Sequence, residues 1–141
     1  MQSSFANEQA PLLLIDENLA DSAIAQALRL VEYNAHAVSE VLSPGIDDPT
    51  MISWLGLQRG IWITADDRAK LQHAKEIHRA GINVLWIRRP KASGVGLNKR
   101  DQLLLLLWVL DPILEELARA HGPRYFRAYY SGKRPRYERI G

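Results

Sequence analysis

The sequence contains no cysteine, which excludes disulfide bonds and thiolate metal sites. Its longest apolar run, residues 103–110, is far too short to cross a bilayer. The first eleven residues lack the basic and apolar blocks of a signal peptide. The histidines show no close metal-ligand spacing. From these absences we expect an intracellular, cytoplasmic protein that does not contact a membrane.

The composition is that of an ordinary globular domain. The chain has 141 residues, of which 47% are hydrophobic and 24% charged, so one domain over residues 1–141 is expected, with its core at about 12–90 and an extension at 98–141. The net charge is only +2, but residues 124–139 hold six basic side chains against one acid, Glu138. This basic C-terminal segment indicates contact with something anionic.

Alternating strand and helix patterns run along most of the chain. Short apolar runs predict strands, and apolar residues with a period near 3.6 predict helices. The expected strands are residues 12–15, 36–41, 61–64 and 83–87; the expected helices are residues 20–32, 48–58, 67–80 and 98–121. We expect Asp48 to cap the second helix, Gly81 to end the third, and Pro112 to kink or restart the last. The alternation predicts an α/β fold with about four parallel strands between helical layers.

Acidic side chains follow two of the expected strands. Asp16 and Glu17 come directly after the first strand, and Asp66 and Asp67 follow the strand that ends at Thr64. In open parallel sheets, ligands bind beyond the carboxyl ends of the strands. Converging carboxylates repel one another unless a cation is bound, and their oxygens suit Mg²⁺ or Mn²⁺. Each acid also has a plainer interpretation, because Asp at a strand-to-helix junction is often a helix cap. Asp48 and Asp67 are the acids most open to that interpretation.

Four segments together resemble the PIN-like nuclease domains of bacterial toxin-antitoxin pairs. They are Leu-Leu-Ile-Asp-Glu-Asn-Leu at 13–19, Asp48 ahead of a short helix, Ile-Trp-Ile-Thr-Ala-Asp at 61–66, and Gly-Ile-Asn-Val-Leu-Trp-Ile at 81–87. The resemblance covers residues 12–90, and the later helix with its basic aromatic tail is similar to one PIN-like subgroup. It implies a compact three-layer fold. The longer helical insertion that carries the middle acid in many PIN domains is absent here, which leaves room for an altered site.

The resemblance also implies a Mg²⁺- or Mn²⁺-dependent ribonuclease, with RNA as substrate and a cognate antitoxin as partner. Asp16, Asp48 and Asp66 correspond to its catalytic and metal-binding acids. Asp67 is taken as a further metal ligand, although Glu17 or Asp47 could be the fourth acid instead. Thr64 would orient a ligand or a water molecule through its hydroxyl group.

Several basic and apolar features carry two interpretations each. Arg68, Lys70 and Arg88 could bind substrate phosphates or could be solvated surface charge. The tail mixes tyrosines with arginines, which suits single-stranded RNA, a docked partner or an added edge strand equally. The helix around residues 103–110 is apolar on every side, so it could form a homodimer or antitoxin interface or could wrap across the sheet.

Two other functions were weighed against the nuclease. Acids after a first strand also resemble the acid pair of phospho-acceptor receiver domains, but that class needs an Asp where Thr64 ends the third strand and a Lys where Arg88 follows the last. The other alternative is a nonenzymatic PIN-like scaffold that binds RNA or protein without a productive metal site.

Overall fold

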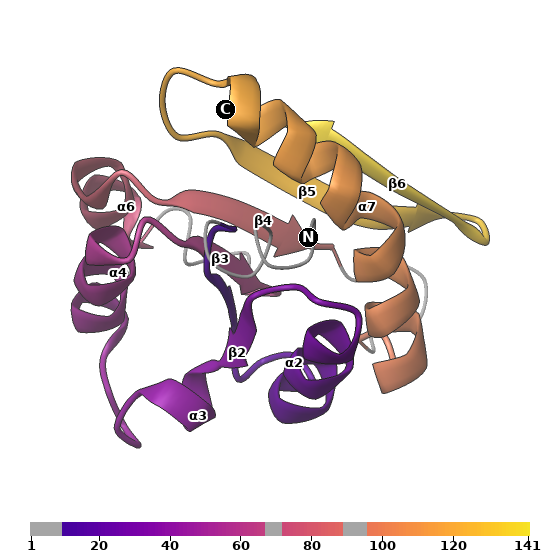
Figure 1. The fold of residues 1–141 in the computed structure, drawn as a ribbon, viewed down its shortest axis with the longest axis horizontal. Coiled ribbons are helices and arrows are strands. Elements are labelled where there is room, and N and C mark those ends of the chain that lie inside the picture. The colour runs from indigo at the N-terminus through magenta and orange to yellow at the C-terminus, as the bar shows by residue number, and fades with distance from the viewer. Residues whose placement is uncertain (1–9, 67–71, 89–95) are drawn as a thin grey trace.

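The computed structural model describes residues 10–66, 72–88 and 96–141 (Figure 1). In these residues the elements run in the order β1 (Leu13–Ile15), α2 (Asp21–Leu30), β2 (Ala35–Ala37), α3 (Val38–Val41), α4 (Asp48–Leu57), β3 (Ile61–Thr64), α6 (Ala74–Ala80), β4 (Asn83–Ile87), α7 (Lys99–Arg119), β5 (Tyr125–Ser131) and β6 (Arg134–Arg139). The expected α/β class with a mostly parallel sheet is confirmed.

All six strands belong to one sheet, in the order β2-β1-β3-β4-β5-β6. The first five are parallel, and β6 runs antiparallel to β5. From β1 the chain moves outward to β2 and then crosses back to β3 on the other side of β1. The direction of winding therefore reverses between β1 and β3, and in doubly wound sheets the carboxyl ends at such a point are where ligands bind.

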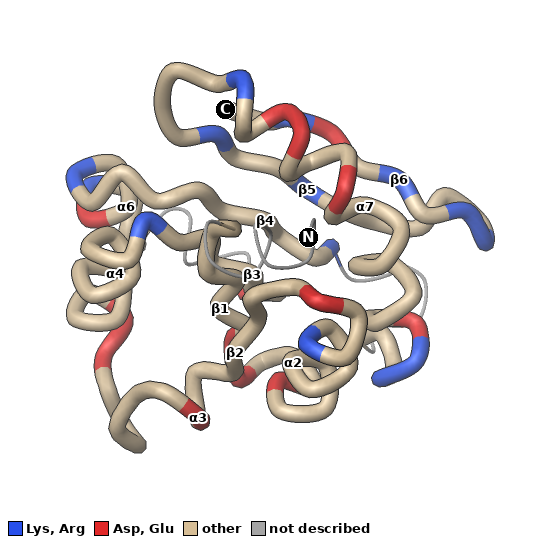
Figure 2. The backbone as a smooth tube through the Cα atoms, viewed as in Figure 1, with Lys and Arg blue, Asp and Glu red and all other residues tan. Residues whose placement is uncertain are grey.

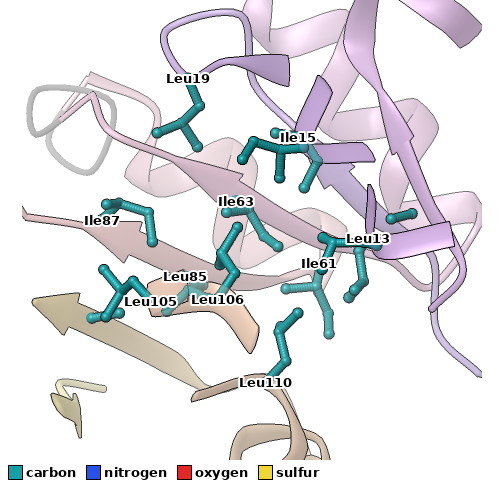
Figure 3. Packing of buried hydrophobic residues seen from close by; sticks show 14 of the residues in the cluster. Leu13, Ile15, Leu19, Ile61, Ile63, Leu85, Ile87, Leu105, Leu106 and Leu110 are labelled. Atoms are coloured by element: carbon teal, nitrogen blue, oxygen red, sulfur yellow. The ribbon is translucent and has the colours of Figure 1, made fainter. Parts of the chain in front are cut away.

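Helices cover both faces of the sheet because successive strand residues point to opposite sides. Leu13, Ile15, Ile61 and Ile63 form one buried cluster with α2 and with the leucines of α7 (Figure 3). The alternate strand residues form a second cluster with α4 and α6; its strand members are Leu14, Trp62, Val84 and Trp86. The central strands β1, β3 and β4 are almost wholly apolar because both of their faces are buried.

The expected second strand at residues 36–41 is wrong in its second half. Strand β2 ends at Ala37, and Val38–Val41 form the short helix α3. The side chain of Glu40 accepts the backbone N–H of Ala37 at 2.8 Å and pairs with Arg29 of α2 at 2.9 Å. These contacts satisfy the start of a helical turn, and they override the strand preference of the two valines.

Other helix boundaries are close to expectation, with one capping residue misassigned. Asp47, not Asp48, caps α4, since its Oδ1 accepts the Thr50 N–H at 2.7 Å and Pro49 lies within the first turn. Gly81 ends α6 in the left-handed conformation, with φ of 71°, as expected. Helix α7 runs from Lys99 to Arg119 without the expected restart at Pro112. No helix among the described residues is long and apolar enough to cross a membrane.

The C-terminal tail adds two strands, so the expected count of about four is wrong and the sheet has six. Strand β5 extends the parallel sheet beside β4, and β6 pairs back along it. On the α7 side Phe126 and Ala128 are buried, and the Tyr137 hydroxyl donates to Glu116 of α7 at 2.6 Å. Apolar and aromatic residues at alternate positions thus dock the tail under α7, which makes it part of the core.

Replacing Phe126 with alanine tests this role of the tail. Phe126 is only 1% exposed, and removing so large a buried side chain should lower the free energy of unfolding by about 3 kcal/mol or more. Urea denaturation gives the measurement. The matched control is Ser131→Ala at the exposed end of the same strand, which should change stability little. Equal stability of the two variants would show that β5 is not part of the core.

Candidate functional site

Asp16 lies at the carboxyl end of β1, beside the point where the winding of the sheet reverses. Its backbone N–H donates to the carbonyl of Ile63 at 2.9 Å, which continues the pairing of β1 with β3. This bond fixes the backbone of Asp16. The residue is partly buried at the edge of the sheet.

The hydroxyl group of Thr64 is the centre of the hydrogen bonds at this edge. Thr64 is the last residue of β3 and is fully buried. Its Oγ1 donates to Oδ2 of Asp16 at 2.7 Å, and it accepts the side-chain amide of Asn18 at 3.0 Å and the backbone N–H of Asp66 at 3.1 Å. One hydroxyl thus connects the segments that follow β1 and β3.

Asn18 is a site residue that the sequence analysis did not single out. Its Nδ2 also lies 3.4 Å from Oδ2 of Asp16, and its Oδ1 accepts the backbone N–H of Ala65 at 2.9 Å. The side chain therefore joins the two loops beyond the strands. The available signal was its place in the Asp-Glu-Asn-Leu segment, where only the acids were taken as functional.

The pKa of Asp16 is raised above its ordinary value of 3.8. Burial is the largest cause, because it disfavours the charged form. The hydrogen bonds from Thr64 and from the Glu17 backbone N–H act in the opposite direction, while the charges of Asp48 and Glu17 raise the pKa further. Asp16 is therefore a carboxylate that a nearby positive charge would stabilise.

The charge of Asp48 is one of the smaller causes that raise the pKa of Asp16. Asp48 is the first residue of α4, and its Oδ2 lies 3.3 Å from Nε2 of His73, a histidine that the sequence did not mark as part of a site. The neighbouring Asp47 is exposed and is used as the helix cap, and its bonds to Thr50 lower its pKa. These roles separate the two acids: Asp48 contacts His73, and Asp47 stabilises the helix.

The backbone of Asp66 is held from both sides. Its N–H donates to Thr64, and its carbonyl accepts the indole N–H of Trp86 in β4 at 3.2 Å. Asp66 is thereby placed just beyond β3. Asp67, Arg68 and Lys70 lie outside the described residues.

Within the described parts of the chain, no three Asp, Glu or His side chains lie together closely enough to form a metal-binding group. The acids that do come near one another offer oxygen donors. On Asp16, the Glu17 N–H occupies one acceptor position of Oδ1 at 2.7 Å, whereas Oδ2 takes both Thr64 and Asn18. An ionised carboxylate has about four acceptor positions, so Oδ1 retains one.

Arg88 follows β4 at the same edge of the sheet and reaches toward β5. Its guanidinium carbon lies 4.1 Å from the centre of the Tyr129 ring, a cation–π contact. The contact holds the charged group over the strand that the basic tail forms. Comparisons of the chain with family models, with curated proteins and with solved structures gave no match.

The raised pKa of Asp16 predicts a specific pH dependence. A folded-state pKa above the unfolded value means that ionising Asp16 costs stability, and this cost appears as the pH rises from 3.8 through the folded pKa. Asp16→Asn carries no charge to desolvate. The stability of this variant relative to the native protein should therefore be greater at about pH 7 than at about pH 4.

Thermal or urea unfolding at the two pH values measures this difference. Glu32→Gln, at an exposed acid beyond α2, serves as the control and should show no such change. A pH-independent difference for Asp16→Asn would mean that the carboxyl group is not desolvated.

Proposed function

We propose that the protein is a PIN-like, Mg²⁺- or Mn²⁺-dependent endoribonuclease that acts in the cytoplasm. The observation that carries this proposal is the Asp16 carboxylate, which Thr64 and Asn18 hold at the carboxyl edge where the winding reverses. A buried hydroxyl that orients a partly desolvated acid favours a site over a surface charge, because perturbed acids concentrate at functional positions.

The oxygen donors fit the proposed cation. Mg²⁺ is commonly held by one or two carboxylates together with water and phosphate oxygens, so Asp16 with Asp48 and Asp66 would suffice, and the PIN-like resemblance adds Asp67. The remaining acceptor position on Oδ1 of Asp16 supports this assignment. When bound, such an ion acidifies water and neutralises charge on a phosphate.

The other residues of the edge serve to position these acids. Thr64 fixes the orientation of the Asp16 carboxylate through Oδ2, and Oδ1 keeps one acceptor position beside its bond from the Glu17 N–H. Asn18 holds the Thr64 hydroxyl and the backbone after β3 in one arrangement. Trp86 anchors the main chain of Asp66 from the neighbouring strand. Such preorganisation is what catalysis of phosphoester hydrolysis requires of a protein scaffold.

The face of β5 and β6 that points away from α7 supports RNA as the substrate. Arg127, Tyr129 and Arg136 share this face, since Arg136 is paired with Tyr129 in the register and Arg127 lies two residues before Tyr129. Glu138 stands opposite Arg127 and forms an ion pair with it at 2.8 Å. Figure 2 shows the basic residues along this hairpin. Arg88 lies between the acidic edge and the hairpin. Arginines and tyrosines in this arrangement suit the phosphates and bases of a single strand.

The toxin role is the narrower part of the proposal. It rests on the PIN-like resemblance, which also supplies an antitoxin as the protein that would bind and inhibit this chain. Co-purification of a small protein encoded beside this chain, with loss of cleavage in the complex, would support the role. Cleavage that no such neighbour inhibits would contradict it.

A nonenzymatic scaffold is the second candidate. The contact of Asp48 with His73 favours it, because His73 lies 3.3 Å from a carboxylate oxygen that a metal ion would need. On this alternative the chain binds RNA through the hairpin and does not cut it.

Cleavage of a mixed single-stranded RNA pool distinguishes the two candidates. The native protein should cut RNA with Mg²⁺ or Mn²⁺ and stop in EDTA, and Asp16→Asn and Asp66→Asn should abolish cleavage. Thr64→Val keeps the shape but removes the hydroxyl, so it should reduce the rate about 10- to 100-fold. The control Glu32→Gln should cut like the native protein. Metal-independent cleavage, or none by a folded native protein that binds RNA, would contradict the nuclease.

Binding of RNA to the hairpin has its own test, which does not require cleavage. In the Asp16→Asn background, Arg136→Gln should weaken binding and lower the slope of log affinity against log salt by roughly one. Tyr129→Ala should weaken binding with little change in that slope, because it removes a stacking surface and no charge. The control Lys75→Gln changes an exposed lysine of α6, outside the hairpin itself. Equal effects of Arg136→Gln and Lys75→Gln would remove the hairpin from the binding surface.

A further inference from the structure

Helix α7 is apolar on two opposite faces, and the sheet covers only one of them. Leu105, Leu106, Val109 and Leu110 are buried against the strands. On the other side Leu104, Leu107 and Trp108 are 42%, 38% and 69% exposed. We call these three residues the outer stripe. Three large apolar side chains at helical spacing on one exposed face form a patch of the kind that marks an interaction site.

Charges of opposite sign flank the outer stripe on the same face of the helix. Arg100 lies one turn before Leu104, and its side chain is 81% exposed. Asp111 lies about one turn after Trp108, and exposed Glu115 follows it by another turn. Figure 2 shows basic residues at the start of α7 and acidic residues in its second half. Arg100 also lies 3.8 Å from the neighbouring Asp101, so the face begins with a partly paired cation, continues with the apolar outer stripe and ends with acids.

We propose that α7 pairs with α7 of a second copy of this chain, antiparallel and about a two-fold axis. The two-fold axis would lie between the two helices, at the level of the midpoint between residues 105 and 106. It sets Arg100 of one copy opposite Asp111 of the other. The same register sets Leu104 opposite Leu107, with Trp108 at the side of this apolar contact. Parallel pairing would set like charges together. Only the antiparallel arrangement satisfies both ends and the apolar centre at once.

The order of charges also identifies the occupant. A two-fold interface uses the same patch twice, so each patch must complement itself. A patch with a positive end, an apolar middle and a negative end meets this requirement. The surface beside the stripe can enlarge the contact: the Tyr33 hydroxyl bonds to Asp111, and α2 ends just before Tyr33 with Leu30 and Val31, which are 85% and 55% exposed.

Sedimentation velocity across micromolar concentrations tests the apolar part of this pairing. The native chain should dimerise reversibly, and Leu104→Ser with Trp108→Ser should weaken the dimer at least tenfold, since apolar burial at its centre is lost. The matched control is Leu57→Ser on α4, where the side chain is 83% exposed but lies away from α7. A native chain that stays monomeric, or one that binds a different protein through Trp108, would overturn the proposal.

A charge exchange tests the antiparallel register. Arg100→Glu and Asp111→Arg should each weaken the dimer, because each sets like charges together, and the double variant should restore it. Tyr33→Phe controls for loss of the Tyr33 bond to Asp111 and should leave the dimer intact. Thermal unfolding verifies that each variant is folded. A double variant no better than its singles would exclude this pairing, and because these side chains are exposed the test holds even if the serine variant fails to fold.

Discussion

The hydrogen bond between Thr64 and Asp16 is the interaction on which the proposed site depends. It joins the ends of β1 and β3 where the winding of the sheet reverses, and it fixes an acid whose burial raises its pKa. Asn18, Ala65 and Asp66 are all held through the same hydroxyl or beside it. The buried hydroxyl group of Thr64 thus joins the ends of two parallel strands through hydrogen bonds. The same bonds position the loops that follow these strands.

The parallel part of the fold could be predicted because its signals are local. Strands buried on both faces must be apolar throughout, and β1, β3 and β4 show this over consecutive residues. The wrong predictions concern segments whose structure is determined by contacts with residues far away in the sequence. Glu40 turns Val38–Val41 into a helix through its bonds to Ala37 and Arg29, and the tail becomes two strands because Phe126 and Tyr137 pack under α7. Neither partnership is visible in a window of neighbouring residues.

The candidate site shows the same division between local signals and distant partners. The acids after the strands were evident, because residue type and place in the strand pattern suffice to mark them. The partners were not: Asn18 reaches Thr64 across 46 positions in the chain, and His73 reaches Asp48 from the start of α6. Asp47 and Asp48 are adjacent in the sequence, and only the geometry of the helix start assigns the cap to Asp47 and leaves Asp48 to contact His73.

The parallel pairing of β4 with β5 also bears on how the chain reaches its fold. Val84 pairs with Tyr125, so the whole of α7 is the crossover between these strands. A helix forms quickly from local contacts, whereas a parallel pair must first close the intervening loop. During synthesis α7 therefore emerges after β1, β3 and β4, whose residues pack against its inner leucines, but before β5 and β6, which complete that cluster. Until β5 arrives, the cluster under α7 lacks Phe126 and Ala128, which leaves more apolar surface exposed at this nascent stage and favours aggregation.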